Sequence, residues 1–311
     1  MFKVTLATSH IALVTAAAAR ALDEDLPPLE AALRAHGARV SVVDWDDPSV
    51  PWGSFAVALL RSTWDYSLRL PQFLDWAAQV SRDTLLLNPL EVVRWNTDKH
   101  YLAELDRAGV PTIPSHFIEP ATDAAQVVRL LDAADSRELV VKPAIGSGSR
   151  DAQRHARSAR ESIIAHIKRL TDAGRSALLQ PYLERVDDQG ETALMFFRGR
   201  FSHAVRKGPL LRAGADPTDQ LFAAEEITPR TPDADELRVG ALALAAIPYR
   251  DLLYARVDLV RDSHGAPRVL ELELTEPSLF FAHAPESAPR FVRELADFIP
   301  PRVRRQDEIS R

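Results

Sequence analysis

The chain of 311 residues contains no cysteine, which excludes disulfide bonds, thiol catalysis and cysteine-ligated metal sites. It also lacks any apolar run near the roughly 20 residues that a membrane-spanning helix needs, so no membrane partner is expected. Its formal net charge of -6 argues against binding nucleic acid by bulk electrostatics, so no nucleic-acid partner is expected. A globular protein acting on small molecules fits these absences.

An apolar run at residues 11–19 could be taken for the core of a signal peptide, but its neighbours argue against export. Polar residues 8–10 precede the run, and the acidic residues 23–25 follow it closely. We therefore expect a buried first strand and a cytoplasmic protein.

Lysine is scarce, since only five of the 38 basic residues are lysine and arginine supplies the rest. An ammonium group is a compact charge that fits against one phosphate oxygen, whereas a guanidinium group is a broad planar fork. Lys99 lies at the start of a predicted helix, Lys142 ends a Val-Val strand, and Lys207 ends a strand before Gly-Pro. These positions are typical of contacts to the phosphates of a nucleotide.

Strand-like and helix-like segments alternate through the first hundred residues, which predicts a largely parallel sheet with helical crossovers. Ligands of such sheets bind beyond the carboxyl ends of the strands. The fold class is α/β, and the predicted parts are an N-terminal parallel-sheet domain at residues 1–96, a small α/β lid lobe at 97–184 and a larger C-terminal α+β lobe at 185–311.

The individual elements follow from hydrophobic periodicity and turn residues. Strands are expected at residues 10–16, 39–45, 56–62, 84–88, 138–142, 177–183, 192–197, 200–206, 253–260 and 268–274. Helices are expected at residues 25–36, 71–80, 98–108, from 123, from 158, 235–246 and 286–298. Ser158 and Glu161 have the spacing of a capping box, and Arg198-Gly199 is expected to turn a β-hairpin.

Three carboxylates are predicted on two consecutive strands near the C-terminus. The alternation of side chains along a strand puts Glu271 and Glu273 on one face, and Asp258 lies on the preceding strand. Together they can ligate one or two Mg²⁺ ions, although a solvated sheet surface would show the same alternation. Arg256 would face the same way as Asp258 and could stabilise a transferring phosphoryl group.

Two segments of the expected lid lobe have features of a nucleotide site. The loop of Gly146, Ser147, Gly148 and Ser149 can offer backbone N–H groups to phosphate oxygens, although most such loops are only turns. The second segment contains Gln180, Tyr182, Leu183 and Glu184. It can hold a flat heterocycle and ribose hydroxyls, or it can be an ordinary linker between domains.

A polar and aromatic cluster follows a predicted parallel strand of the N-terminal domain. It comprises Arg61, Ser62, Thr63, Asp65 and Tyr66 around Trp64. Side chains at that end of a strand are well placed for a substrate pocket, and a firmly anchored loop is an equally good interpretation.

In this order the motifs resemble those of the ATP-grasp superfamily, which includes glutathione synthetase, D-alanine–D-alanine ligase and RimK-like ligases. The resemblance covers nearly the whole chain. Its motifs are Asn96-Thr-Asp-Lys99, Val-Val-Lys142-Pro with the Gly-Ser loop, Gln180-Pro-Tyr-Leu183, Arg206-Lys207, Arg256-Val-Asp258 and Glu271-Leu-Glu273. Many members have Glu-x-Asn in the last motif, and here Glu273 replaces the asparagine.

The resemblance implies that ATP and Mg²⁺ bind between the lid lobe and the C-terminal lobe. Lys99 and Lys142 would contact the α- and β-phosphates, and residues 146–149 would close over the β/γ end. Residues 180–183 would hold adenine, Glu184 would bind ribose, and Lys207 would lie near the γ-phosphate.

More narrowly, Leu60-Arg-Ser-Thr-Trp-Asp-Tyr66, Ser202-His-Ala-Val-Arg-Lys207 and Glu271-Leu-Glu-Leu-Thr-Glu-Pro277 look like cyclo-ligases that form D-cycloserine. That resemblance implies activation of an amino-acid-like carboxylate as an acyl phosphate, followed by cyclisation of O-ureido-D-serine. Arg256 and Lys207 would steady the phosphoryl group, and Arg206 would join residues 61–66 in binding substrate.

Two alternatives stay open from the sequence. One is an ATP-grasp ligase that joins two separate molecules, such as amino acids. The other is a nucleotide-binding protein that retains the fold without turnover. The oligomeric state is also undecided, and a homodimer is one option.

Overall fold

The first sheet of the protein is parallel, as the sequence predicts. In the computed structural model, which describes residues 6, 7, 9–211 and 226–299, its strands lie in the order β2–β1–β3–β4. The apolar runs of β1 and β3 are buried on both faces, as central parallel strands require. The elements are β1 (His10–Thr15), α1 (Leu26–Ala35), β2 (Arg39–Asp44), β3 (Val57–Leu60), α2 (Leu70–Asp83), β4 (Leu85–Leu87) and α3 (Leu90–Asn96).

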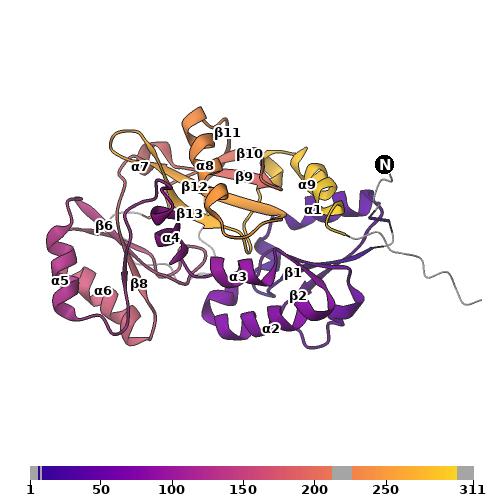
Figure 1. The fold of residues 1–311 in the computed structure, drawn as a ribbon, viewed down its shortest axis with the longest axis horizontal. Helices are drawn as coiled ribbons and strands as arrows, with labels where there is room; N and C mark the ends of the chain where they lie inside the picture. The colour runs from indigo at the N-terminus through magenta and orange to yellow at the C-terminus, as the bar shows by residue number, and fades with distance from the viewer. Residues whose placement is uncertain (1–5, 8, 212–225, 300–311) are drawn as a thin grey trace, which may run out of the picture.

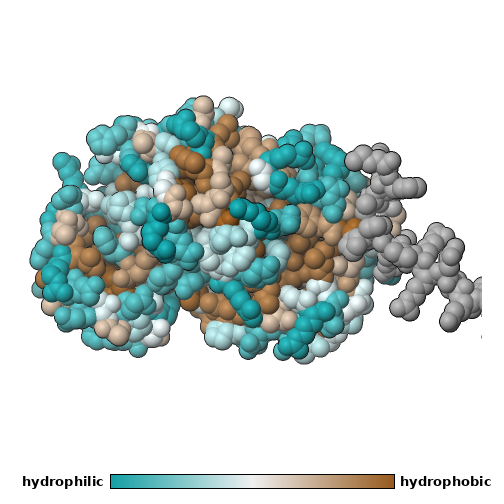
Figure 2. Space-filling model, viewed as in Figure 1, coloured by the Kyte–Doolittle hydropathy of each residue, from teal (hydrophilic) through white to brown (hydrophobic). Residues whose placement is uncertain are grey.

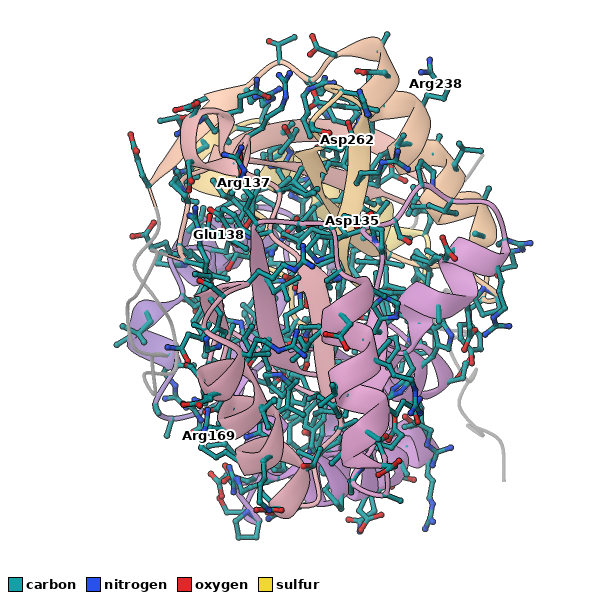
Figure 3. The ribbon with its side chains drawn as sticks, turned by 90° about the vertical axis from the view of Figure 1, so that its left-hand side faces the viewer. Asp135, Arg137, Glu138, Arg169, Arg238 and Asp262 are labelled. Carbon is teal, nitrogen blue, oxygen red and sulfur yellow. The ribbon has the colours of Figure 1, made fainter. Side chains whose placement is uncertain are left out.

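A second, antiparallel sheet forms a separate lobe after the helix α4 (Tyr101–Arg107). Its strands lie in the order β5–β8–β6–β7. Figure 3 looks onto this lobe, with its two helices in front of the sheet and Arg169 toward the outer end. The elements are β5 (His116–Ile118), α5 (Ala124–Ala133), β6 (Glu138–Pro143), β7 (Gln153–Ala156), α6 (Arg160–Asp172) and β8 (Ala177–Pro181).

A third sheet, also antiparallel, carries the predicted carboxylates and has the order β11–β10–β9–β12–β13. The predicted hairpin is confirmed, since Arg198 and Gly199 both have positive φ between β9 and β10. The elements are α7 (Val186–Gln189), β9 (Glu191–Phe197), β10 (Arg200–Lys207), β11 (Ile227–Arg230), α8 (Ala234–Ala246), β12 (Tyr254–Arg261), β13 (Pro267–Glu273) and α9 (Ser287–Ala296).

One local prediction about helix capping is wrong. Helix α6 begins at Arg160 after Ala159, and no side chain caps it, so Ser158 does not form the expected capping box. The capping box belongs instead to α8, where the backbone N–H of Asp233 donates to Glu236 Oε2 at 2.8 Å.

The hydrophobic cores show how the three sheets are joined. The small lobe has its own core, whereas one core joins the first sheet to the third through α1 and α9, which lie side by side (Figure 1). Leu29 and Leu33 of α1 and Phe291 and Leu295 of α9 are completely buried in that shared core. The N-terminal sheet and the C-terminal lobe therefore form one packed unit, with the small lobe at one end of the molecule (Figure 1).

The face of the molecule shown in Figure 2 has hydrophilic residues along most of its outline, with hydrophobic areas between them. Among the helices that the structure describes, none combines the length and the apolar character needed to cross a bilayer.

Candidate functional site

A cavity of about 180 Å³ lies where the three sheets meet. Its wall takes residues from η3 (Trp64–Leu68) in the N-terminal domain, from the small lobe and from β10, β12 and β13. The predicted residues on this wall are Tyr66, Lys99, Lys142, Gly146, Ser147, Gly148, Ser149, Gln180, Tyr182, Leu183, Lys207, Arg256, Asp258, Glu271 and Glu273.

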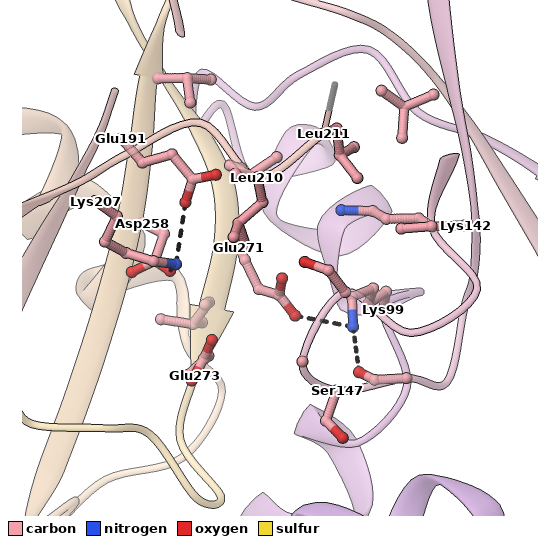
Figure 4. A pocket seen from close by; sticks show the side chains of 18 of the residues that line it. Lys99, Lys142, Ser147, Glu191, Lys207, Leu210, Leu211, Asp258, Glu271 and Glu273 are labelled. Carbon is pink, nitrogen blue, oxygen red and sulfur yellow. Dashed lines mark hydrogen bonds and ion pairs between the residues drawn. The ribbon is translucent and has the colours of Figure 1, made fainter. Parts of the chain in front are cut away.

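The three lysines singled out in the sequence all line this cavity and are buried. Lys99 Nζ lies 2.8 Å from Glu271 Oε1 and donates to the Gly146 carbonyl at 2.8 Å (Figure 4). Lys207 Nζ lies 3.1 Å from both Asp258 Oδ2 and Glu191 Oε2. Burial lowers the pKa of Lys142, and the nearby charges of Lys99 and Lys207 act in the same direction. These ammonium groups can attract an anion into the cavity, in competition with the carboxylates that pair with Lys99 and Lys207.

The carboxylates of β12 and β13 lie side by side as the sequence predicts. In the antiparallel register Asp258 pairs with Glu271, and Arg256 pairs with Glu273. Arg256 donates through Nε to Asp258 Oδ1 at 2.8 Å and also binds the carboxylate of Glu273. This cluster places three acids and a guanidinium group on one wall of the cavity.

The donor chemistry of this wall fits a hard divalent cation. Burial raises the pKa of Glu273 to about 8, opposed by Arg256 and reinforced by the carboxylates of Asp258 and Glu271. Such an excess of buried carboxylate oxygens favours Mg²⁺. Among the described residues no three acids or histidines are gathered in a ligand arrangement, and Lys99, Lys207 and Arg256 pair with the three carboxylates.

The Gly-Ser loop connects β6 to β7 and touches the N-terminal domain. Ser147 Oγ donates to the Trp64 carbonyl at 2.6 Å. Gly148 and Ser149 have positive φ of 62° and 59°, so the loop turns sharply beside the cavity. A Cβ on Gly146 would lie 3.0 Å from Pro143 Cγ, which explains a small residue there. The loop is thus held by Trp64, through Ser147, and by Lys99, through the Gly146 carbonyl.

The expected nucleobase segment lies at the end of β8. Gln180 Nε2 donates to Ser115 Oγ at 2.8 Å, and the Tyr182 ring lies 3.6 Å from the Arg154 guanidinium carbon. Apolar side chains pack around this part of the cavity: Ile113, Val140, Val186, Val260, Leu270 and Leu211. A flat apolar slot with polar groups at its edge suits a heterocycle. Glu184 does not line the cavity.

Most of the predicted substrate cluster lies behind the cavity wall. Arg61 is buried, and its Nη2 donates to the Pro277 carbonyl at 2.9 Å. Ser62 and Thr63 are also fully buried, and Asp65 accepts from Trp45 Nε1 at 2.8 Å. Of the cluster, Trp64 and Tyr66 reach the cavity. The anchored-loop interpretation therefore describes the geometry of the first three residues.

Arg206 also lies away from the cavity wall. Its Nε donates to the Gln189 carbonyl at 2.9 Å, which ties β10 to α7.

Several wall residues were given no role of their own from the sequence, although two of them, Asn96 and Glu276, belong to the quoted motifs. They are Asn96, Glu191, Glu276, Ser278 and Phe280. Glu191 is the first residue of β9 and pairs with Lys207 of β10, and Glu276 lies three residues beyond Glu273. A search for acids near the predicted lysines and the predicted metal ligands would have found both.

Comparisons with known proteins place this geometry among related chains. Residues 11–88 match the family model described as the N-terminal domain of D-cycloserine synthetase DcsG. The cycloserine biosynthesis protein DcsG of Streptomyces lavendulae is 42% identical over 298 residues, covering 94% of this chain and 99% of that protein. The crystal structure of D-cycloserine synthetase DcsG superposes with a TM-score of 0.86 at 41% identity, over 94% of this chain and 100% of that one.

A more distant structure shares the fold. The D-alanine–D-alanine ligase of Bacillus anthracis complexed with ATP superposes with a TM-score of 0.64 at 16% identity, over 94% of this chain and 96% of the ligase.

Proposed function

This chain belongs to the D-cycloserine synthetase family of ATP-grasp ligases, and from that membership we propose that it cyclises O-ureido-D-serine to D-cycloserine with ATP. The ATP-grasp fold predicted from the sequence is confirmed, and so is the enzyme class, a carbon–nitrogen ligase. The observation that carries the proposal is the cavity in which Lys99, Lys142 and Lys207 face the carboxylates of β12 and β13.

The reaction would proceed in two bond exchanges. A carboxylate oxygen of the substrate attacks the γ-phosphorus of ATP, the bond to ADP breaks, and an acyl phosphate forms. The ureido nitrogen that is bonded to oxygen then attacks the acyl carbon, phosphate leaves, and that nitrogen loses its proton. Because D-cycloserine lacks the carbamoyl group, one water must also enter, and this group leaves as carbon dioxide and ammonia.

The side chains of the cavity would position the nucleotide and stabilise its charge. Lys99, Lys142 and the loop at residues 146–149 would bind phosphates, while Lys207 and Arg256 would face the phosphoryl group in transfer. Gln180, Tyr182 and Leu183 would hold adenine, and Glu184 would reach ribose once the small lobe closes. Buried charges in a dry site act more strongly than in water, which suits this role.

Asp258, Glu271 and Glu273 would hold Mg²⁺. Bound there, Mg²⁺ would supply charge neutralisation for the phosphates. Lys99 pairs with Glu271 and Arg256 with Glu273 in this structure, and both side chains would turn toward phosphate in the loaded site.

The amino-acid substrate would lie at the end of the cavity formed by Trp64, Tyr66, Ser278 and Phe280. Arg61, Ser62, Thr63 and Asp65 would support this wall from behind, and Arg206 would fix the strand that carries Lys207.

The experiment that tests the function measures ADP release with Mg-ATP and O-ureido-D-serine as the sole amino acid, with mass detection of the product. D-cycloserine formed together with ADP is the expected result. Asp258→Asn should reduce ADP formation by at least about 100-fold, because one ligand charge opposite Lys207 and Arg256 is lost. ADP release that requires a second amine would instead identify a ligase joining separate molecules, and full activity of Asp258→Asn would contradict the metal role.

A further inference from the structure

Glu276 is an acid of the cavity wall that the reaction described above does not use. It follows β13, its side chain is buried, and only 9% of the residue is exposed. The hydroxyl of Tyr66 hydrogen-bonds to its carboxylate, and Trp64 Nε1 donates to its backbone carbonyl at 3.2 Å. Two side chains of the N-terminal domain therefore hold this residue: Tyr66 contacts its carboxylate and Trp64 its main chain.

The other acids of the cavity are engaged by cations. Glu271 pairs with Lys99, and Glu191 with Lys207 (Figure 4). Asp258 pairs with both Lys207 and Arg256. Glu273 pairs with Arg256. Within residues 9–211 and 226–299, Glu276 makes no such ion pair, although Lys99 and Arg256 attract it from a distance. It is the acid of this wall that a cationic ligand would stabilise most.

The surroundings of Glu276 indicate which end of the ligands it faces. Asp258, Glu271 and Glu273 are each paired with a cation, whereas a carboxylate without a close cation repels phosphate, so Glu276 does not suit the nucleotide end of the cavity. Its neighbours Trp64 and Tyr66 form the wall that remains after the lysines and the apolar slot are assigned to the nucleotide. Burial raises the pKa of Glu276 to about 7, because its charged form lacks a close cation. An ammonium group supplies that cation together with three hydrogen-bond donors.

We propose that Glu276, held by the Tyr66 hydroxyl, binds the α-ammonium group of the amino-acid substrate. This inference rests on the proposed function for the presence of an amino acid in the cavity. It assigns Glu276 to substrate specificity: a carboxylate substrate without an amino group would leave a buried charge without a partner. Because Tyr66 belongs to the N-terminal domain and Glu276 to the C-terminal lobe, the subsite joins the two.

The test compares O-ureido-D-serine with the same molecule lacking its amino group, 3-(ureidooxy)propionate, by ADP release at saturating Mg-ATP. For the unmodified protein, kcat/KM should favour the amino compound by about 100-fold. Glu276→Gln should raise KM for O-ureido-D-serine by about 10- to 100-fold and leave the des-amino compound nearly unaffected, because a charge-assisted bond to the ammonium is lost. Tyr66→Phe should show a smaller change of the same kind.

Two controls separate this role from others. Glu91→Gln alters an exposed glutamate of α3 and should leave both substrates unchanged. The KM for Mg-ATP should stay within about 3-fold in Glu276→Gln, since a metal-binding or purely structural role would shift it as well.

The outcomes distinguish the inference from the function on which it rests. If the unmodified protein cyclises O-ureido-D-serine but Glu276→Gln retains the full preference for the amino compound, the ammonium subsite is refuted and the function stands. If the unmodified protein releases no ADP with O-ureido-D-serine, either alone or with a second amine, the proposed function fails and this inference fails with it.

Discussion

The sharpest stability prediction concerns Asp25, which immediately precedes α1 and connects the N-terminal domain to the C-terminal lobe. Its carboxylate accepts three backbone N–H groups, from Leu279 at 2.5 Å, Phe280 at 3.1 Å and Phe281 at 2.8 Å. Arg61 Nη2 lies 3.5 Å from the same carboxylate. Phe280 has a positive φ of 53°, which an aromatic residue adopts only when its surroundings impose it. Asp25 thus holds a strained segment beside the cavity.

The magnitude follows from the groups that would lose their partner. Asp25→Ala leaves three N–H groups and the buried Arg61 guanidinium without that acceptor. Removing one member of a buried charged pair costs about 3–5 kcal/mol, and each orphaned donor adds to that cost unless water reaches it. We therefore expect the free energy of unfolding to fall by about 4 kcal/mol. Asp25→Asn retains one acceptor oxygen and should lose about half as much.

The same substitution should also slow the reaction. The backbone carbonyl of Ser278 accepts a hydrogen bond from Arg256 Nη1 at 3.1 Å, and the Phe280 ring centre lies 5.4 Å from the Arg256 guanidinium carbon. Loosening this segment would therefore shift Arg256 relative to the phosphoryl group.

Urea unfolding followed by tryptophan fluorescence, together with ADP release, measures both effects. Glu24→Gln changes the exposed neighbour of Asp25 and serves as the matched control. An Asp25→Ala protein within about 1 kcal/mol of the control would refute the reasoning, since water or main-chain groups would then have replaced the carboxylate.

Two further predictions concern pH and backbone crowding. Burial lowers the pKa values of His166 and His203 to about 4, so each contributes stability that is lost as the pH drops from about 6.5 to 4. The raised pKa values of Glu273 and Glu276 act in the opposite direction over the same range, so the test is the difference in free energy of unfolding between the protein and His203→Gln. That difference should change as the pH drops through the window, and a difference that stays constant would contradict the histidine contribution. Gly190→Ala places a Cβ 2.3 Å from the Lys207 carbonyl oxygen at a φ of +70°, so it should destabilise the protein by more than about 2 kcal/mol and weaken ATP binding. Gly174→Ala is the matched control, because Gly174 has a φ of +73° but open space around the added Cβ. Equal melting temperatures of the two variants, with and without ATP, would argue against the prediction.

Much of the site chemistry could be predicted because it depends on strand periodicity. Glu271 and Glu273 alternate with leucines along β13, and Asp258 lies opposite Glu271 in the observed register. Three of the five lysines, Lys99, Lys142 and Lys207, line one cavity. Both predictions depend on where a residue stands in its own strand or turn, and folding does not change that position.

The remaining features depend on tertiary contacts that no local pattern encodes. Arg61 follows a parallel strand as a substrate residue would, but its side chain turns into the interface with Asp25 and Pro277. Ser158 has capping-box spacing, but α6 begins two residues later. Strand β7, which carries Gln153, Arg154 and His155, lacks the apolar alternation of a strand and is specified mainly by pairing with β6.

The packing of α1 against α9 has a consequence for synthesis on the ribosome. Helix α1 ends at Ala35, but α9, which covers its apolar side, begins only at Ser287. At roughly 5–20 residues per second, translation of the intervening chain takes about 13 to 50 s. During that time the side of α1 that packs against α9 in the folded protein stays exposed to solvent. The part of the enzyme that is made first is therefore completed last, and the cavity wall formed by Trp64 and Tyr66 reaches its final packing only after almost the whole chain has been synthesised.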